Sequence, residues 1–362
     1  MATKKKKTVI KLLDFSDNYT TNHNQLYIST DFNEKLTKLK EKCIKEKKEL
    51  FVGIDEAGRG PVVGPLVFGL VVFSGSDKFK AQFEKNSHTF IDEIKIKDSK
   101  QMTKDERNKS ANFLNEHFPC ATLALDAQFI TTEMDRSSLN DICLWAVIKL
   151  LENFKNNFSD ETFNEKITQM KGIRTMSGAV FTKNRTITQT KLPTDQTVFT
   201  INVIIDSLGN SATPLLTLQS RFPKYKFNIL PKADSLHQVV SAASIVAKVK
   251  RDALLDRIIK THILEGCLCL EKKVELKRNV SYTVFKNDNT VDEEKIFDTK
   301  ELQKSKLRCL LNCNGYPSCP YVKKYLTEFP NCPSIRFKWS TVKKVFVTGR
   351  RLKGFRNVYF KE

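Results

Sequence analysis

The sequence predicts an α/β fold, because short apolar segments typical of strands alternate with segments of helical periodicity. Strand-like runs lie at residues 50–54, 65–73, 199–205 and 227–230. Helical spacing or a capping signal marks residues 32–50, 107–117, 141–154 and 235–260. The run at 65–73 is apolar throughout, as expected of a strand that is covered on both faces.

Three of these elements carry more specific signals. The first strand stops at Asp55 and is followed by a turn rich in Gly and Pro. Thr103-Lys-Asp-Glu has the pattern of a capping box, which would start the helix over 107–117. The helix over 235–260 has one apolar stripe, formed by Val239, Ala243, Val246, Val249 and Ala253. Lys248 and Arg251 lie outside this stripe, and the small residues at 241–244 would let the helix backbone lie close to a sheet.

Changes of composition divide the chain into four parts. Residues 1–49 are polar and lysine-rich and form a basic N-terminal extension. A catalytic core is expected over 50–265, with an inserted loop at 155–197 where periodicity vanishes. Residues 266–308 form a charged insertion, and 309–362 form a C-terminal region. Loops of this length inside a compact domain are uncommon and are often functional or disordered.

Charge indicates the kind of partner. The 61 Lys and Arg residues against 41 Asp and Glu give a net charge of +20, which predicts nucleic acid first and an anionic membrane surface second. The longest apolar run, 61–73, is too short to span a bilayer. The N-terminus lacks the apolar stretch of a secretory signal, and the nine scattered cysteines are typical of a reducing compartment. Membrane insertion and secretion are therefore disfavoured.

Four carboxylates lie where strands end or a helix begins: Asp55 and Glu56, Asp206, and Asp234. The carboxyl ends of strands in an α/β sheet are common ligand sites. Carboxylates gathered there repel one another unless cations neutralise them, and hard oxygen ligands favour Mg²⁺ or Mn²⁺. Two such ions suit phosphodiester cleavage. A positive surface around an acidic centre is therefore the pattern of a metal-dependent nuclease.

Each carboxylate also has a simpler interpretation. Asp206 could form an Asx turn, Asp234 could be an N-cap, and Asp55 and Glu56 could be turn residues. Adjacent strand residues point to opposite faces, so the latter two share a site only if the strand ends or twists there. The sequence Gly58-Arg59-Gly60 follows directly. Its glycines allow close backbone approach to a ligand, which makes this segment a candidate substrate-reading loop.

Several segments together resemble the ribonuclease HII family, also called type 2 ribonuclease H. The resemblance is carried, in order, by GIDEAGRGPVVGP from Gly53, KDSK from Lys97, IDSLG from Ile205, KADSLHQVVSAASIVAKVKRD from Lys232, NGYP from Asn314 and IRFKWST from Ile335. The segments cover roughly 200 residues in the family's order, which makes a chance match very improbable. The segment from Lys232 is most similar to the eukaryotic catalytic subunit.

The resemblance implies roles for individual residues. Asp55, Glu56, Asp206 and Asp234 would be the catalytic carboxylates and the ligands of two divalent ions, Mg²⁺ or Mn²⁺. Gly58, Arg59 and Gly60 would grip the 2′-hydroxyl at an RNA–DNA junction. Tyr316 would stack on the next deoxyribose and reject a 2′-hydroxyl there, since this group alone separates the two sugars. Lys100 and Lys232 would contact phosphates, unless they are only solvated charges.

The resemblance also implies an activity and a fold. The fold would be a ribonuclease H-like mixed β-sheet flanked by helices, with a helical C-terminal extension. The activity would be hydrolysis of RNA in RNA/DNA hybrids, with cleavage 5′ of single ribonucleotides embedded in duplex DNA, leaving 3′-hydroxyl and 5′-phosphate ends. Two non-catalytic subunits in a heterotrimer and a nuclear location are implied as well, and Lys4–Lys7 would suit nuclear import. The alternatives are a non-catalytic basic nucleic-acid-binding protein and a monomeric bacterial-type ribonuclease HII.

The chain departs from the family pattern at several points. The two insertions exceed the family's usual spacing, and the second separates Tyr316 from the core. Cys313 stands where a glycine is expected, and His237 replaces an aromatic residue. Cys267, Cys269, Cys309 and Cys313 flank the second insertion and could bind zinc, although scattered thiols are the commoner case.

The C-terminal tail interleaves basic side chains with aromatic and β-branched ones. An exposed apolar strand of this composition invites pairing with another chain. We therefore expect 342–360 to dock partner subunits, with a direct grip on DNA as the alternative.

Overall fold

The computed structural model describes residues 24–75, 90–91, 94–95, 101–158, 200–209, 212–272 and 308–348. Six strands form the main sheet: β1 (Asn24–Ile28), β2 (Leu50–Ala57), β3 (Leu66–Ser74), β6 (Cys120–Leu125), β7 (Ile201–Asp206) and β8 (Tyr225–Leu230). Their order is β1-β6-β3-β2-β7-β8. A separate short pair joins β4 (Phe90–Ile91) and β5 (Ile94–Lys95).

The main sheet is mixed. The pairs β1/β6, β6/β3 and β3/β2 are antiparallel, whereas β2/β7 and β7/β8 are parallel. The predicted α/β class, a mixed sheet flanked by helices with a helical C-terminal region, is confirmed. Every residue of β3 is buried, as its continuous apolar sequence predicts for a strand covered on both faces.

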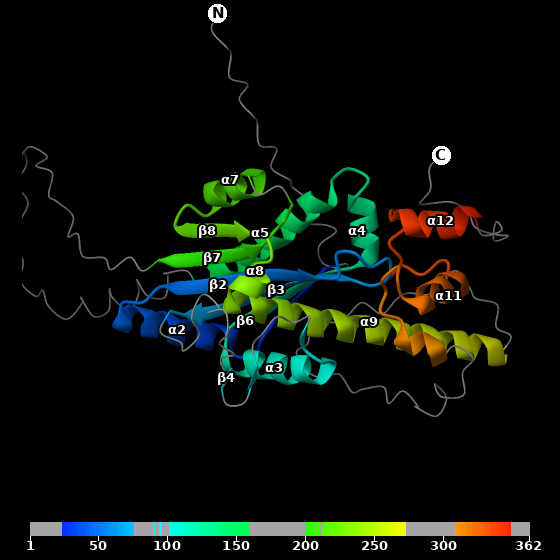
Figure 1. The fold of residues 1–362 in the computed structure, drawn as a ribbon, viewed down its shortest axis with the longest axis horizontal. Helices are drawn as coiled ribbons and strands as arrows, with labels where there is room; N and C mark the ends of the chain where they lie inside the picture. Colours follow the sequence, from blue (N-terminus) through cyan, green and yellow to red (C-terminus); the bar gives the residue numbers. More distant parts are fainter. Residues whose placement is uncertain are drawn as a thin grey trace, which may run out of the picture.

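The helices of the core are α2 (Phe32–Glu46), α3 (Lys104–His117), α4 (Ala127–Glu133), α5 (Leu139–Phe158), α7 (Ala212–Arg221), α8 (Ala233–Leu236) and α9 (Gln238–Lys272). The capping box at the start of α3 is confirmed, because the Thr103 hydroxyl accepts from Glu106 N at 3.2 Å and Thr103 N donates to the Glu106 carboxylate at 2.8 Å. Among the described elements, α9 is the longest and runs along the sheet (Figure 1).

Helices cover both faces of the sheet. On one face, buried side chains of α2 and α5 form a cluster with β2, β3, β6 and β7. On the other face, α3 and the first half of α9 pack on β2, β3 and β7. Figure 1 shows α9 and α3 below the sheet and α5 above it. Burial on both faces fixes which end of each strand can hold polar side chains.

The helix α9 lies directly on the sheet because both surfaces lack side-chain bulk at the contact. Ala242 and Ala243 of α9 are fully buried, as the small residues of this segment predict. The sheet contributes Gly53 and Gly69, where a Cβ would lie 2.2 Å from the Val239 carbonyl oxygen and 2.3 Å from that of Ala243. Contacts this short are not tolerated in a close-packed interior, so these two positions require glycine.

Residues before 50 contribute more to the core than their polar composition predicts. Strand β1 forms one edge of the sheet by pairing with β6. In α2, Phe32, Leu36 and Cys43 are buried in the cluster beside α5. The folded sheet therefore begins before residue 50, the expected start of the core, because alternating side chains of a short edge strand carry a weak sequence signal.

Two other elements differ from the expected boundaries. Strand β2 continues through Asp55 and Glu56 to Ala57 rather than stopping at Asp55. The predicted helix over 235–260 is two helices, because His237 has extended dihedrals (φ −128°, ψ 119°) between α8 and α9. Neither difference is signalled by glycine or proline at the position concerned.

The C-terminal region packs on the second half of α9. It consists of a 3₁₀ turn (Arg308–Asn312), α11 (Pro320–Glu328) and α12 (Ser340–Thr348). Its apolar side chains form a cluster with Leu255, Ile259 and Ile263 of α9 and with Val62 and Val63. Figure 1 shows α11 and α12 beside the distal part of α9.

The expected docking strand over 342–360 is wrong for its first residues. Residues 342–348 belong to α12, and Val342 is fully buried in the C-terminal cluster, because its apolar side chains recur at helical spacing. The rest of the tail, like the insertions at 159–197 and 273–307, lies outside the described residues.

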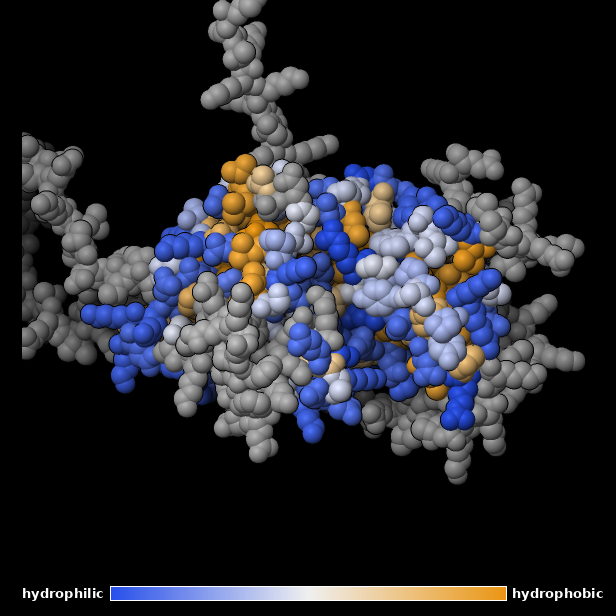
Figure 2. Space-filling view, viewed as in Figure 1, coloured by the Kyte–Doolittle hydropathy of each residue, from blue (hydrophilic) through white to orange (hydrophobic). Residues whose placement is uncertain are grey.

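The surface is mainly hydrophilic. Figure 2 shows hydrophobic side chains over α7 and around α11 and α12, and Leu216 of α7 is among the exposed apolar residues. Among the described helices, none combines the length and hydropathy needed to cross a bilayer.

Candidate active site

The four predicted carboxylates meet at one end of the parallel strands. Ile54 of β2 pairs with Ile205 of β7, so the following residues, Asp55 and Asp206, lie at the ends of neighbouring strands. Asp206 Oδ1 accepts a hydrogen bond of 3.0 Å from the backbone N–H of Ala233, which brings the start of α8 to the same place. Asp234, the next residue in α8, is 2% exposed. The topology of the sheet therefore gathers these side chains.

The environment of Asp55 and Glu56 disfavours their negative charges. Burial raises the pKa of Asp55 to about 7 and that of Glu56 to about 8. The charge of Asp206 raises both values further, and that of Asp234 acts on Asp55. Opposing contributions come from a hydrogen bond of Ser244 to Asp55 and from the guanidinium of Arg59 near Glu56. Such accumulation of partly buried acids is typical of functional sites.

The donor set fits divalent cations of the hard type. All four side chains offer carboxylate oxygens, which Mg²⁺ and Mn²⁺ prefer, and their mutual repulsion is what a cation would relieve. No three His, Cys, Asp or Glu side chains of the described residues are arranged as a ready-made metal site. The fit therefore rests on the chemistry and burial of the carboxylates.

Adjacent positions on β2 do not prevent Asp55 and Glu56 from acting together. Asp55 is 5% exposed and interacts with the side of the sheet covered by α9 through Ser244. Glu56 pairs with Arg59, with 3.6 Å between Oε1 and Nη1. Each carboxylate still feels the charge of Asp206, because both lie near the end of the strand.

The 58–60 loop follows the carboxylate pair in a conformation that needs glycine. Gly58 has φ +93°, and a Cβ on it would lie 2.6 Å from the carbonyl oxygen of Pro65. The guanidinium of Arg59 hydrogen bonds to Asn140 at the start of α5 in addition to pairing with Glu56. The loop is therefore tied to the carboxylates on one side and to α5 on the other.

Tyr316 lies against this loop. A Cβ on Gly60 would be 3.7 Å from Cε1 of the Tyr316 ring, and the tyrosine is 39% exposed. Gly315, which precedes it with φ +79°, accepts a hydrogen bond of 2.8 Å from Val62 N through its carbonyl oxygen. The long insertion between the core and Tyr316 has therefore not separated the tyrosine from the loop.

The two predicted phosphate-binding lysines have different outcomes. Lys232 is exposed and has left-handed dihedrals (φ 57°) directly before α8, two residues from Asp234. Lys100 lies outside the described residues. The same is true of the side chains of Cys267 and Cys269, while Cys313 is buried and Cys309 hydrogen bonds to Lys324.

Sequence reasoning did not identify four residues that organise the site: Ser244, Asn140, Arg251 and Arg336. Arg251 is 4% exposed although it lies outside the apolar stripe of α9, and Arg336 is fully buried. Both arginines stand in segments that resemble the ribonuclease HII family, which was the available signal. Asn140 carries no such signal, because it precedes the periodic part of α5.

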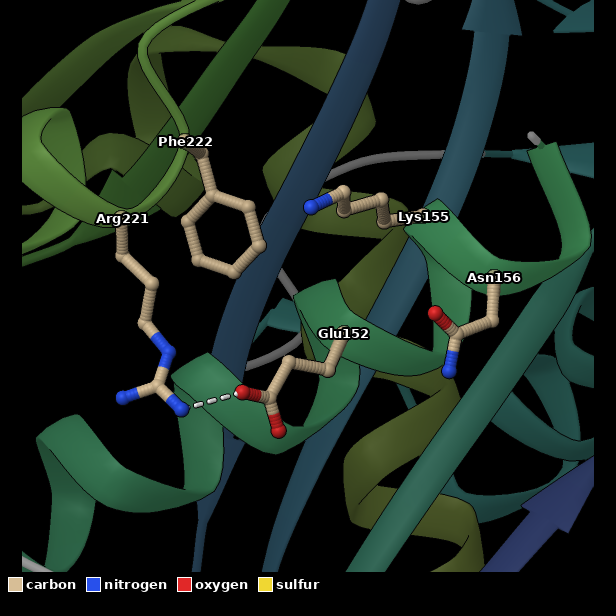
Figure 3. A pocket seen from close by; sticks show the side chains of 5 residues that line it. All are labelled: Glu152, Lys155, Asn156, Arg221 and Phe222. Atoms are coloured by element: carbon tan, nitrogen blue, oxygen red, sulfur yellow. Dashed lines mark hydrogen bonds and ion pairs between the residues drawn. The ribbon is translucent and has the colours of Figure 1, made fainter. Parts of the chain in front are cut away.

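A cavity of about 330 Å³ lies elsewhere, between α5 and α7. Figure 3 shows Arg221 directed at Glu152, with Phe222 and Lys155 at the sides. Arg221 precedes Tyr225, which pairs with Ile201 at the start of β7. The cavity is therefore at the opposite end of this strand from Asp206.

Comparisons with known proteins agree with this arrangement. The sequence matches the family described as ribonuclease HII over residues 52–191 and 159–266. Ribonuclease HII of Methanococcus vannielii is 29% identical over 218 residues, which are 59% of this chain and 68% of that protein. A ribonuclease H2 subunit of Rattus norvegicus is 31% identical over 210 residues, which are 58% of this chain and only 55% of the rat protein.

Among solved structures, the ribonuclease H2 from Pyrococcus horikoshii OT3 aligns with 83% of this chain and 99% of its own. The sequence identity is 20% and the TM-score is 0.44.

Proposed function

This chain belongs to the ribonuclease HII family of metal-dependent endonucleases, and from that premise we propose that it cuts the RNA strand 5′ of ribonucleotides, including single ribonucleotides embedded in duplex DNA. The observation that carries the proposal is the position of Tyr316 against Gly60, beside the four carboxylates. A loop that reads a 2′-hydroxyl and an aromatic wall that rejects one can together recognise an RNA–DNA junction.

The proposed division of labour follows the geometry. Asp55, Glu56, Asp206 and Asp234 would hold two divalent ions, Mg²⁺ or Mn²⁺. When bound, these ions supply an activated water and stabilise the charge on the leaving 3′-oxygen, so the products carry 3′-hydroxyl and 5′-phosphate ends. The hydrogen bonds from Ala233 N to Asp206 and from Glu56 N to Asp55 Oδ1 (2.7 Å) fix two of the carboxylates.

The 58–60 loop would bind the ribose. Since the Arg59 side chain is engaged by Glu56 and Asn140, the backbone of the loop is the part we assign to the 2′-hydroxyl. Lys232, exposed near Asp234, and Lys100 would contact phosphates. The net charge of +20 favours approach of any nucleic acid without selecting among them.

One assay tests this function. The chain is incubated with Mg²⁺ and three end-labelled substrates: a DNA duplex with one ribonucleotide, a continuous RNA/DNA hybrid, and an all-DNA duplex. We expect cleavage of the first two, 5′ of the ribonucleotide in the first, and none with EDTA. Binding of all three substrates without cleavage would favour a non-catalytic binding protein.

Partners and location are further proposals. The mammalian ribonuclease H2 relatives support assembly with two non-catalytic subunits, and we place this assembly in the nucleus. Deletion of 349–362, the tail beyond α12, should then abolish co-purification with partners and leave cleavage by the isolated chain unchanged. A lower salt dependence of DNA binding after the deletion would instead assign the tail to DNA.

A further inference from the structure

Two buried arginines lie beneath the 58–60 loop and Tyr316. Arg251 of α9 is 4% exposed, and Arg336, four residues before α12, is 0% exposed. Arginine is rarely buried this deeply unless it is paired. Between the two side chains runs the segment that joins the loop to β3, residues 61–65.

Arg336 holds this segment at three points. Its Nε donates to the Gly64 carbonyl oxygen at 3.0 Å, and its Nη1 donates to the Arg59 carbonyl oxygen at 3.2 Å. Its backbone N–H donates to the Val62 carbonyl oxygen at 2.9 Å. A single side chain therefore bonds to a carbonyl inside the 58–60 loop and to another at the far end of the segment.

Arg251 holds the tyrosine side. Its Nη2 donates to the Asn314 carbonyl oxygen at 2.6 Å, and its Cζ lies 5.3 Å from the centre of the Tyr316 ring. It also touches the loop, because a Cβ on Gly58 would be 3.4 Å from its Cγ. Arg251 thus spans the distance between the loop and Tyr316.

The two guanidinium groups are costly as structural elements. The carboxylate that pairs with Arg251 is Asp252, at 3.1 Å, whose side chain is 37% exposed. Among the described residues, Arg251 Nε and Arg336 Nη2 have no hydrogen-bond acceptor. Burial, and then the charge of Arg251, lower the pKa of Arg336 to about 9. Unpaired buried donors destabilise a fold, so stability alone does not account for the pair.

We propose that Arg251 and Arg336 are positioning residues that fix Tyr316 and the 58–60 loop at one separation and so set the preference for a single embedded ribonucleotide over a continuous hybrid. This inference rests on the proposed function. At a junction the ribose and the adjacent deoxyribose are read together, so the separation between their two readers matters. On a continuous hybrid every neighbouring sugar is a ribose, and Tyr316 has no deoxyribose to meet.

The test uses variants that keep the charge. In Arg251→Lys and Arg336→Lys the ammonium can satisfy one carbonyl but lacks the planar fork that reaches two. The matched control is Arg221→Lys, whose guanidinium bonds to Glu152 at the opposite end of β7. For each protein, kcat/KM is measured with Mg²⁺ on the single-ribonucleotide duplex and on the hybrid.

The readout is the ratio of the two kcat/KM values, which does not depend on how much of a preparation is folded. We expect this ratio to fall about tenfold or more in both variants, since a misplacement of about 1 Å can cost up to 100-fold, and to stay unchanged in Arg221→Lys. A second route to the same displacement is Gly315→Ala, where the Cβ would lie 2.4 Å from the Val63 carbonyl oxygen. This variant should lower the ratio with both arginines intact.

The outcomes separate this inference from the function on which it rests. A wild-type chain that cuts neither substrate contradicts the proposed function. A wild-type chain that cuts both, with an unchanged ratio in Arg251→Lys or Arg336→Lys, contradicts the positioning role and leaves the function in place. Equal losses on both substrates have the same meaning, because they indicate only structural damage.

Discussion

The four carboxylates and Tyr316 reach the same end of the sheet by different routes. The carboxylates are placed by the ends of paired strands and by the start of α8, so local sequence and sheet topology determine their position. Tyr316 is placed by contacts between distant segments, including the bond from Arg336 to Gly64 across 272 residues of sequence. One half of the site is therefore built into the sheet, and the other half is attached to it.

This difference teaches that reaction and recognition can fail separately. Damage to the strand ends should remove cleavage of every substrate, whereas damage to the attached half should change which substrate is preferred. Four predictions sharpen or break this separation, in order of decreasing effect.

The largest effect is expected from removing one carboxylate charge. Asp55→Asn or Asp206→Asn should lower kcat on both ribonucleotide substrates by about a hundredfold or more, because the amide cannot hold a divalent ion as the carboxylate does. Binding of the hybrid, measured by fluorescence anisotropy in EDTA, should stay nearly unchanged. Retention of more than about a tenth of wild-type activity, set against the several kcal/mol that ion loss costs, would exclude the residue as a metal ligand.

A smaller but general effect is expected where α9 lies on the sheet. Gly69→Ala should lower the free energy of unfolding by about 3 kcal/mol, because the new Cβ would overlap the Ala243 carbonyl oxygen. Gly60→Ala is the control for the added methyl group, since its Cβ meets only the Tyr316 ring, at 3.7 Å. Equal stability of the two variants in urea would show that α9 can move away from the sheet at little cost.

The attached half should respond to mild acid. His262 Nδ1 lies 2.7 Å from the Tyr325 hydroxyl in the C-terminal cluster, and burial lowers the pKa of His262 to about 4. The unfolded chain binds this proton near pH 6.5 and the folded chain does not, so stability falls as pH drops from 6.5 to 4, by up to about 3 kcal/mol.

This loss can be assigned to His262 by comparing variants. The pH dependence of urea unfolding should become shallower in His262→Gln and should stay as in wild type in His117→Gln, where the exposed histidine at the end of α3 is replaced. The same slope in both variants would mean that His262 is not the group concerned.

The smallest effect is a change of preference. Tyr316→Ala should reduce cleavage at a single embedded ribonucleotide about tenfold more than cleavage of the hybrid, since base or sugar stacking on an aromatic ring contributes about 1–3 kcal/mol. Phe in place of Tyr316 keeps the ring and is the matched control. Parallel losses on both substrates in the alanine variant would remove Tyr316 from junction reading.

The limits of sequence reasoning follow the same division. The strands around Asp55 and Asp206, the capping box at Thr103 and the helix over α5 were predictable, because their signals are periodic and local. The burial of Arg251 was not, because it depends on Asn314 and Tyr316, which come from a segment beyond a long insertion. Strand β1 was missed for the opposite reason, since a five-residue edge strand carries too few apolar positions to stand out.

The long sequence separation between Arg336 and its partners has a consequence for how the protein is made. Domains fold as the chain emerges from the ribosome, and every residue of the carboxylate group emerges well before Arg336. A nascent chain can thus close its sheet while the segment that places Tyr316 is still being synthesised. Premature termination or proteolysis between α9 and α11 would therefore release a chain with its acidic centre complete and its junction reader missing.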